Sequence, residues 1–115
     1  MAVTLPDNIY QALHEGKVIP AHPLALNADG TLNETYQRQL TRYYLAAGAG
    51  GVAVGVHTTQ FEIRKPEHNL YETVLKLASE ELDNTGNKNA IRIAGICGST
   101  TQALKEAEVA VKYGY

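Results

Sequence analysis

Two adjacent threonines, Thr58 and Thr59, are the side chains of this sequence that are best placed to do chemistry. They follow residues 51–56, in which three valines alternate with glycine or alanine. Such a run predicts a buried parallel strand, with helices against the valines and a closely packed neighbour against the small face. Parallel α/β proteins keep their ligand sites at the carboxyl ends of strands. The two hydroxyls and nearby backbone N–H groups therefore predict a site for a small anion such as a carboxylate.

A second set of chemically capable side chains consists of His22, His57 and Cys97. Each falls near the end of a different predicted strand, and imidazole and thiolate are ligands of zinc and other transition metals. Their spacing matches no metal-binding signature, and a histidine at a strand end is more often a hydrogen-bonding loop residue. A metal-dependent enzyme that uses these residues is therefore an alternative, and the leading hypothesis includes neither a metal nor another cofactor.

The chain offers no covalent nucleophile of the kind that attacks a carbonyl. A Schiff-base lysine needs a dry, enclosed pocket, and none of the lysines falls at the carboxyl end of a predicted strand; they are Lys17, Lys65, Lys76, Lys88, Lys105 and Lys112. Residues 95–101 follow a strand and open a capped helix, where an anion can bind. That segment lacks the lysine of a phosphate-binding loop, which favours a structural role.

Composition places the chain among ordinary globular proteins. It has 115 residues, 44% apolar content and a net charge of −2, which give no basic patch for nucleic acid. No run is long enough to span a membrane, and the start lacks a signal-peptide pattern. Cys97 has no partner for an internal disulfide. A cytoplasmic location is therefore expected.

The predicted elements are a short helix that opens at residues 5–8, followed by three strand–helix units. The expected strands are 17–26, 51–56 and 90–96, the first being irregular because it contains two prolines. A loop at 57–66 follows the second strand, and a helix from Pro66 follows the loop. Thr31 and Ser99 each begin a capping box and are expected to start the other two long helices.

Alternation of strands and helices predicts a parallel sheet with helical crossovers. Three such strands with helices on one side leave an apolar face exposed. The predicted fold of residues 1–115 is therefore the incomplete amino-terminal portion of a single (β/α)8 TIM barrel, made of the short helix and the first three β/α units. The alternative is a compact, doubly wound domain that acts as a small non-catalytic binding module.

The order of these motifs resembles the start of the dihydrodipicolinate synthase and N-acetylneuraminate lyase family. Residues 21–24 look like the family's Thr-Pro-aromatic strand end, and residues 29–32 resemble its Asp-Gly turn. Residues 54–59 are similar to the strand that ends in its Gly-Thr-Thr-Gly-Glu motif, and residues 94–101 to its third-strand Ala-Gly segment. His57 and Gln60 stand in place of the motif's two glycines, and Phe61 in place of its glutamate.

The resemblance implies a Schiff-base lyase or aldolase that acts on pyruvate or a related 2-keto acid. On that resemblance, Thr58 is the catalytic hydroxyl of a proton relay and Thr59 binds the carboxylate of the substrate. The Schiff-base lysine and the relay tyrosines belong to strands beyond Tyr115, so the isolated chain is expected to be inactive. The family also implies a homo-oligomer, usually a tetramer, with no nucleic-acid or membrane partner.

Overall fold

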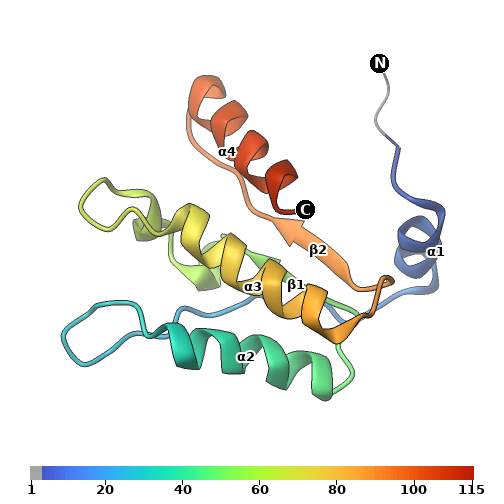
Figure 1. The fold of residues 1–115 in the computed structure, drawn as a ribbon. Coiled ribbons are helices and arrows are strands. Elements are labelled where there is room, and N and C mark those ends of the chain that lie inside the picture. The colour runs from blue at the N-terminus through green and yellow to red at the C-terminus, as the bar shows by residue number, and fades with distance from the viewer. Residues whose placement is uncertain (1–3) are drawn as a thin grey trace.

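The computed structural model describes residues 4–115, which form an α/β fold (Figure 1). The helices are α1 (Asp7–Glu15), α2 (Glu34–Ala46), α3 (Tyr71–Thr85) and α4 (Thr100–Lys112), and the strands are β1 (Gly51–Val54) and β2 (Ile91–Ala94). Two 3-10 helices, η1 (His57–Thr59) and η2 (Phe61–Arg64), occupy the predicted loop after β1. The two strands pair in parallel, with Gly51 opposite Ile91 and Val54 opposite Ala94. The predicted parallel sheet is therefore confirmed.

The first predicted strand, residues 17–26, is not a regular strand in the structure. Its backbone runs parallel to β1 through three hydrogen bonds, from Gly50 N–H to the Val18 carbonyl, from Ala53 N–H to that of Pro20, and from His22 N–H to that of Ala53. Between this segment and β1, sheet pairing is limited to the single parallel bridge of Ala21 and Ala53. Proline lacks a backbone donor, and the two prolines of this segment interrupt the ladder.

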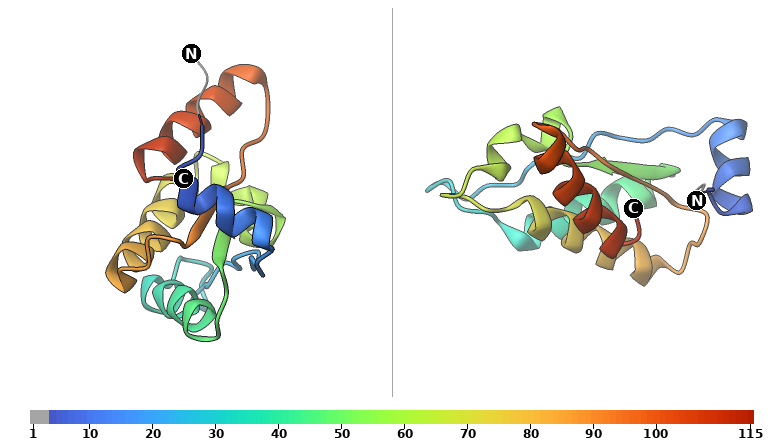
Figure 2. Two further views of the ribbon diagram at one scale, coloured as in Figure 1. Left: turned by 90° about the vertical axis from the view of Figure 1, so that its right-hand side faces the viewer. Right: turned by 90° about the horizontal axis from the view of Figure 1, so that it is seen from above.

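Helices α2, α3 and α4 all lie on one side of the extended segments (Figure 2). Val52 and Val54 of β1 point to that side and are fully buried, and they pack in one cluster with Val74, Leu75 and Ala78 of α3. The predicted packing of helices against the valines is confirmed.

Helix α1 contacts β2 at the amino end of the sheet, and no helix in residues 4–115 covers the rest of the opposite face of the strands (Figure 2). Paired residues of a parallel sheet point to the same face, so Ala21, Ala53 and Ile93 share this one. Ala21 is exposed, Ala53 is half-buried and Ile93 is 39% exposed. Ile91, at the amino end of this face, is buried, but the rest of the face is not sealed, which argues against the alternative of a doubly wound, self-sufficient domain.

The helix boundaries confirm some predicted caps and correct others. Ser99 is the N-cap of α4, since its side chain accepts a hydrogen bond from Gln102 N–H. Thr31 is not the N-cap of α2. Asn33 takes that place by accepting from Tyr36 N–H, while the hydroxyl and N–H of Thr31 both donate to Asp29. Asp29 competes successfully because an aspartate readily accepts from the residue two positions on.

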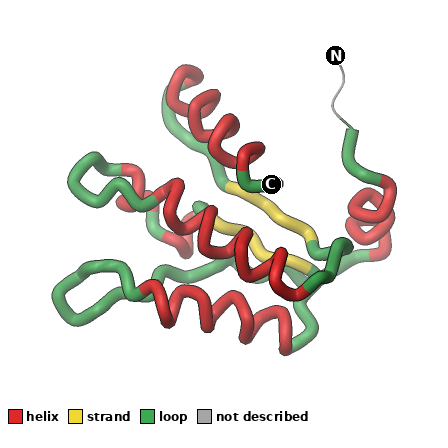
Figure 3. Tube along the Cα trace, viewed as in Figure 1, coloured by secondary structure: helices red, strands yellow, loops and turns green. Residues whose placement is uncertain are grey.

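The middle helix begins at Tyr71, five residues after the predicted start at Pro66. Asn69 has a positive φ of 48°, and the segment between η2 and α3 consists of turns (Figure 3). The helix ends at Thr85, with Gly86 in the left-handed conformation that commonly terminates helices. None of the helices in residues 4–115 combines the length with the apolar character that a membrane span requires.

Candidate functional site

The two predicted site residues occupy η1, directly after the carboxyl end of β1, but in different environments. Thr58 is exposed, whereas Thr59 is fully buried. They do not point together into one cavity, because one side chain faces solvent and the other faces the protein. The backbone N–H of Thr59 closes the turn by donating to the carbonyl of Val56.

The hydroxyl of Thr59 ties two segments together. It donates to the carbonyl of His22 at 2.6 Å and accepts from the backbone N–H of Gly55 at 3.1 Å. This side chain therefore adds a link between the first extended segment and the end of β1 to the backbone hydrogen bond from His22 N–H to the Ala53 carbonyl. A contact between the Thr59 hydroxyl and a carboxylate requires the hydroxyl proton to leave the His22 carbonyl.

Thr58 is flanked by aromatic groups that the family motif lacks. The rings of His57 and Phe61 stack with centroids 5.4 Å apart and an interplanar angle of 20°. Both side chains are exposed, as is Gln60, whose φ of 78° shows why a glycine suits this position. The rim beside Thr58 is therefore bulkier than a Gly-Thr-Thr-Gly sequence would make it.

Arg64 and Glu106 form a buried ion pair at the same edge of the sheet. Arg64 Nε lies 2.9 Å from Glu106 Oε1, and each side chain is only 9% exposed. Arg64 Nη2 also donates to the carbonyls of Gly55 and Gly95, at 2.9 Å and 3.0 Å. Sequence reasoning did not identify either residue, because they lie 42 positions apart and their spacing carries no motif.

Tyr71 reaches the same strand end from the first turn of α3. Its hydroxyl donates to the carbonyl of Gly95 at 2.7 Å, and its ring lies 4.7 Å from the guanidinium carbon of Arg64. Burial, with a further contribution from the nearby charge of Glu106, raises the pKa of Tyr71 to about 12. Tyr71 is thus a neutral donor at physiological pH.

The side chain of His22 points away from the strand ends, towards α2. Its ring is fully buried, with Nδ1 2.7 Å from the Pro23 carbonyl and Nε2 2.8 Å from Thr41 Oγ1. The carbonyl can only accept, so Nδ1 carries the proton and Nε2 accepts from the Thr41 hydroxyl. Desolvation lowers the pKa of His22 despite the opposing hydrogen bond to Pro23, so the ring is neutral. It is a satisfied core histidine.

The metal site that the alternative hypothesis requires does not form in the described part of the chain. Among residues 4–115, no three His, Cys, Asp or Glu side chains are grouped so that they could hold a metal ion. His22 is buried towards α2, His57 is exposed beside Phe61, and Cys97 is half-buried. The alternative hypothesis, in which the carboxyl ends of three strands bring these residues together, is wrong in this respect, because side chains at those ends point to different faces.

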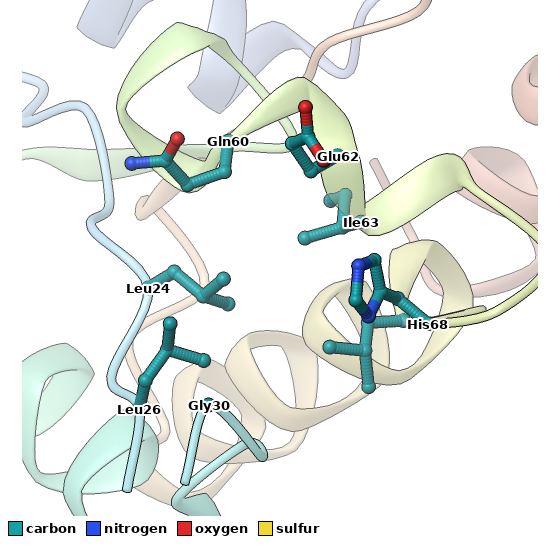
Figure 4. A pocket seen from close by; sticks show the side chains of 8 residues that line it. Leu24, Leu26, Gly30, Gln60, Glu62, Ile63 and His68 are labelled. Carbon is teal, nitrogen blue, oxygen red and sulfur yellow. The ribbon is translucent and has the colours of Figure 1, made fainter. Parts of the chain in front are cut away.

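A small cavity of about 170 Å³ lies between the first two β–α loops (Figure 4). Its lining comprises Leu24, Leu26, Gly30, Gln60, Glu62, Ile63, His68 and Leu70. Figure 4 shows the two leucines across from Ile63 and His68. Neither Thr58 nor Thr59 lines it, so it is separate from the predicted hydroxyl site.

Solved structures of similar fold include N-acetylneuraminate lyase from Mycoplasma synoviae. Its crystal form I matches with a TM-score of 0.73 and 20% identity over 95% of this chain and 34% of that one. Crystal form II gives a TM-score of 0.71 and 21% identity over 86% and 32% of the two chains. Wild-type sialic acid aldolase of Ruminococcus gnavus gives 0.64 and 21% over 84% and 31%.

The chain thus spans about a third of the length of these lyases. No protein-family model and no curated protein sequence matches it. The TM-scores establish similarity of fold, and at sequence identities near 20% the comparison establishes the fold alone. At that level the predicted resemblance to the dihydrodipicolinate synthase and N-acetylneuraminate lyase family is confirmed, since the chain has the fold of a part of such lyases.

Proposed function

We propose that the chain is the amino-terminal portion of a (β/α)8 Schiff-base lyase or aldolase that acts on pyruvate or a related 2-keto acid. The observation that carries this proposal is the pair Thr58 and Thr59 in the turn that follows β1, in a chain whose fold matches parts of an N-acetylneuraminate lyase and of a sialic acid aldolase. The uncovered face of the sheet supports it, because further strands of a barrel would bury that face.

The proposed reaction begins with a lysine from a later strand of the whole protein. Its neutral ε-amino group attacks the C2 carbonyl of the keto acid, water leaves, and uptake of one proton gives a protonated Schiff base. Removal of a C3 proton then gives an enamine, whose C3 attacks the second substrate in the direction of bond formation. Carbon–carbon cleavage follows the same steps in reverse.

Within this scheme, Thr58 passes protons and Thr59 orients the carboxylate. The exposure of Thr58 supports the first role, because its hydroxyl is accessible at the strand end. For the second role, the Thr59 hydroxyl must exchange its hydrogen bond with the His22 carbonyl for one with the substrate. Either role requires proper placement of the turn that carries both residues.

Borohydride trapping tests the Schiff base. The full-length protein is incubated with pyruvate, reduced with borohydride and analysed by mass spectrometry. The proposal predicts a stable mass increase, because reduction converts the imine to a secondary amine that water cannot hydrolyse. The absence of any increase with pyruvate and with a panel of small 2-keto acids would remove the proposal.

Proton transfer by Thr58 is tested in the same protein by deuterium exchange at C3 of pyruvate, followed by NMR. Replacing Thr58 with valine is expected to preserve trapping while slowing exchange by about 100-fold or more, the usual contribution of a proton-transfer group. Thr35→Val on the exposed side of α2 is the matched control. Equal exchange rates in the two variants would contradict the role of Thr58.

A further inference from the structure

Three extended segments end at the same edge of the sheet, and two side chains connect them there. Thr59 joins the carbonyl of His22 to the N–H of Gly55. Arg64 then joins the carbonyl of Gly55 to that of Gly95 through one nitrogen, Nη2. Gly55 is therefore held from both sides, and it is the residue from which the chain turns into η1.

The backbones of Gly55 and Gly95 approach unusually closely at this point. A Cβ atom on Gly95 would lie 2.5 Å from the carbonyl oxygen of Gly55, and one on Gly55 would lie 2.9 Å from the ring of Tyr71. Two carbonyl oxygens that converge on one spot repel each other, and a shared cationic donor offsets that repulsion. Arg64 supplies this donor.

Glu106 fixes the orientation of the guanidinium from the opposite side. It accepts from Arg64 Nε through Oε1, from Cys97 N–H through the same oxygen at 3.2 Å, and from Gln102 Nε2 through Oε2 at 2.8 Å. The rings of Phe61 and Tyr71 lie against the guanidinium, 5.6 and 4.7 Å from its central carbon. The side chain is thus restrained both by its ion pair and by the aromatic rings.

The buried ion pair of Arg64 and Glu106 is energetically unfavourable compared with apolar side chains in the same place. Burying an ion pair costs desolvation that apolar side chains of similar volume avoid. In addition, Arg64 Nη1 is buried without a hydrogen-bond partner among residues 4–115. This cost is explained if function requires Arg64 to hold the carbonyls of Gly55 and Gly95 in place at the strand ends.

We propose that Arg64 is a positioning residue, which holds the Gly55 turn so that η1 presents Thr58 at the mouth of the site. The inference rests on the proposed function, since it assigns Arg64 to the same proton-transfer step. Arg64 acts through the backbone and does not touch the substrate. A guanidinium suits this task because its planar fork can bind Glu106 and both carbonyls in one fixed geometry.

The test uses the full-length protein and the double variant Arg64→Met/Glu106→Leu. This variant removes both buried charges together, so it leaves no unpaired charge and is expected to fold. C3 deuterium exchange of pyruvate is expected to fall by at least about tenfold, as for other small displacements of catalytic groups. Borohydride trapping is expected to persist, because the lysine does not depend on Gly55. Exchange within twofold of the wild type would overturn the proposal, as would a folded variant that loses trapping as well.

Arg64→Lys keeps the test valid if the double variant does not fold. Lysine retains the charge opposite Glu106 but lacks the planar fork, so C3 exchange is again expected to fall while trapping persists. Arg38→Lys, in a half-exposed ion pair between α2 and α3, is the matched control and should leave exchange unchanged. An equal effect of the two lysine variants would overturn the proposal.

A second readout separates this inference from the proposed function. Amide hydrogen exchange of residues 56–59 needs no substrate, and it is expected to accelerate in the double variant relative to the wild type. If the wild-type protein traps no keto acid, the proposed function fails. Faster amide exchange in the double variant would still support the role of Arg64 in holding the Gly55 turn. Unchanged amide exchange would remove the positioning role whatever the trapping result.

Discussion

The two faces of the parallel strands differ sharply in how they are covered. On the helix-facing side, Val52 and Val54 have no solvent exposure, and Arg92 of β2 donates to Ser79 Oγ of α3 at 2.8 Å. On the opposite side, the same strands present Ala53, which is half-buried, and Ile93, which is 39% exposed. One side is a finished core, whereas the other buries Ile91 at its amino end and leaves the side chains beyond it small or uncovered.

This difference shows which part of the core belongs to the chain itself. An apolar strand face that is left in water adds nothing to folding, and monomeric proteins limit such surface. Helix α4 repeats the pattern, since Leu104 and Val111 lie seven residues apart on it and are 62% and 73% exposed. Both surfaces are those that further β/α units of the proposed barrel would cover.

The largest expected effect concerns Ile93. In the proposed full-length barrel, Ile93→Ala should lower the free energy of unfolding by about 2 to 5 kcal/mol, as much as Leu75→Ala in the helix-facing core, because both side chains would be buried. Equilibrium denaturation of the two variants makes the comparison. A cost clearly below about 1 kcal/mol is the value expected for an exposed side chain. It would mean that the face is open in the whole protein, and the barrel proposal would lose its support.

A smaller effect is expected at Gly51, which shares the small face with Ala53. A Cβ atom at Gly51 would overlap the backbone of Ile91, so Gly51→Ala should destabilise by about 1 to 3 kcal/mol as the strands move apart. The conservative change Ala53→Gly is the control and should cost about 1 kcal/mol or less. Thermal unfolding of the full-length variants measures both changes in stability. An unchanged stability of Gly51→Ala would contradict the prediction, because it would show that the small face has room for a methyl group.

On the helix-facing side, the test residue is Glu81 of α3. It is buried, and Arg42 and Arg38 of α2 bind its two oxygens at 2.8 and 3.1 Å and lower its pKa. Glu81→Gln should cost about 1 to 2 kcal/mol, since it weakens charge-assisted hydrogen bonds between two helices. Glu80→Gln, in a more exposed pair, is the control and should cost about 0.5 kcal/mol or less. Equal losses of stability in the two variants would contradict the prediction, because they would mean that both ion pairs are equally exposed to solvent.

The smallest effect is a dependence of stability on pH that comes from His22. Its pKa in the folded protein lies below the ordinary value of 6.5 because the ring is buried. Below about pH 6.5 the unfolded chain takes up a proton that the folded chain does not, so stability is lost as the pH falls towards the lowered pKa. The slope can reach about 1.4 kcal/mol per pH unit. Denaturation between pH 5 and 7.5 should show a flatter slope for His22→Gln, and an unchanged slope would exclude His22 as its source.

The elements that were predicted correctly depend on local patterns. The start of α1, the burial of the valines and the Ser99 cap each follow from residues within one or two turns of each other. The failures involve competition that spacing does not reveal. Thr31 donates its hydrogen bond to Asp29, so Asn33 is the N-cap of α2. Turns follow η2, so α3 begins only at Tyr71.

The site shows the same division. The sequence located Thr58 and Thr59 at the end of a buried strand, because valine alternation marks the strand and its last residue marks the edge. It did not show that Thr59 would turn inward to the His22 carbonyl while Thr58 remained exposed. Their roles towards a substrate remain predictions.

By itself, then, the sequence determined the order of helices and strands, the parallel pairing and the face that the helices cover, since each follows from the periodicity of apolar residues. Only the tertiary structure decided that His22 is a core residue and that Arg64 meets Glu106 across the ends of β1 and β2. These contacts join positions far apart in the chain. Their geometry depends on how strands and loops converge in space, and no local pattern of residue types encodes it.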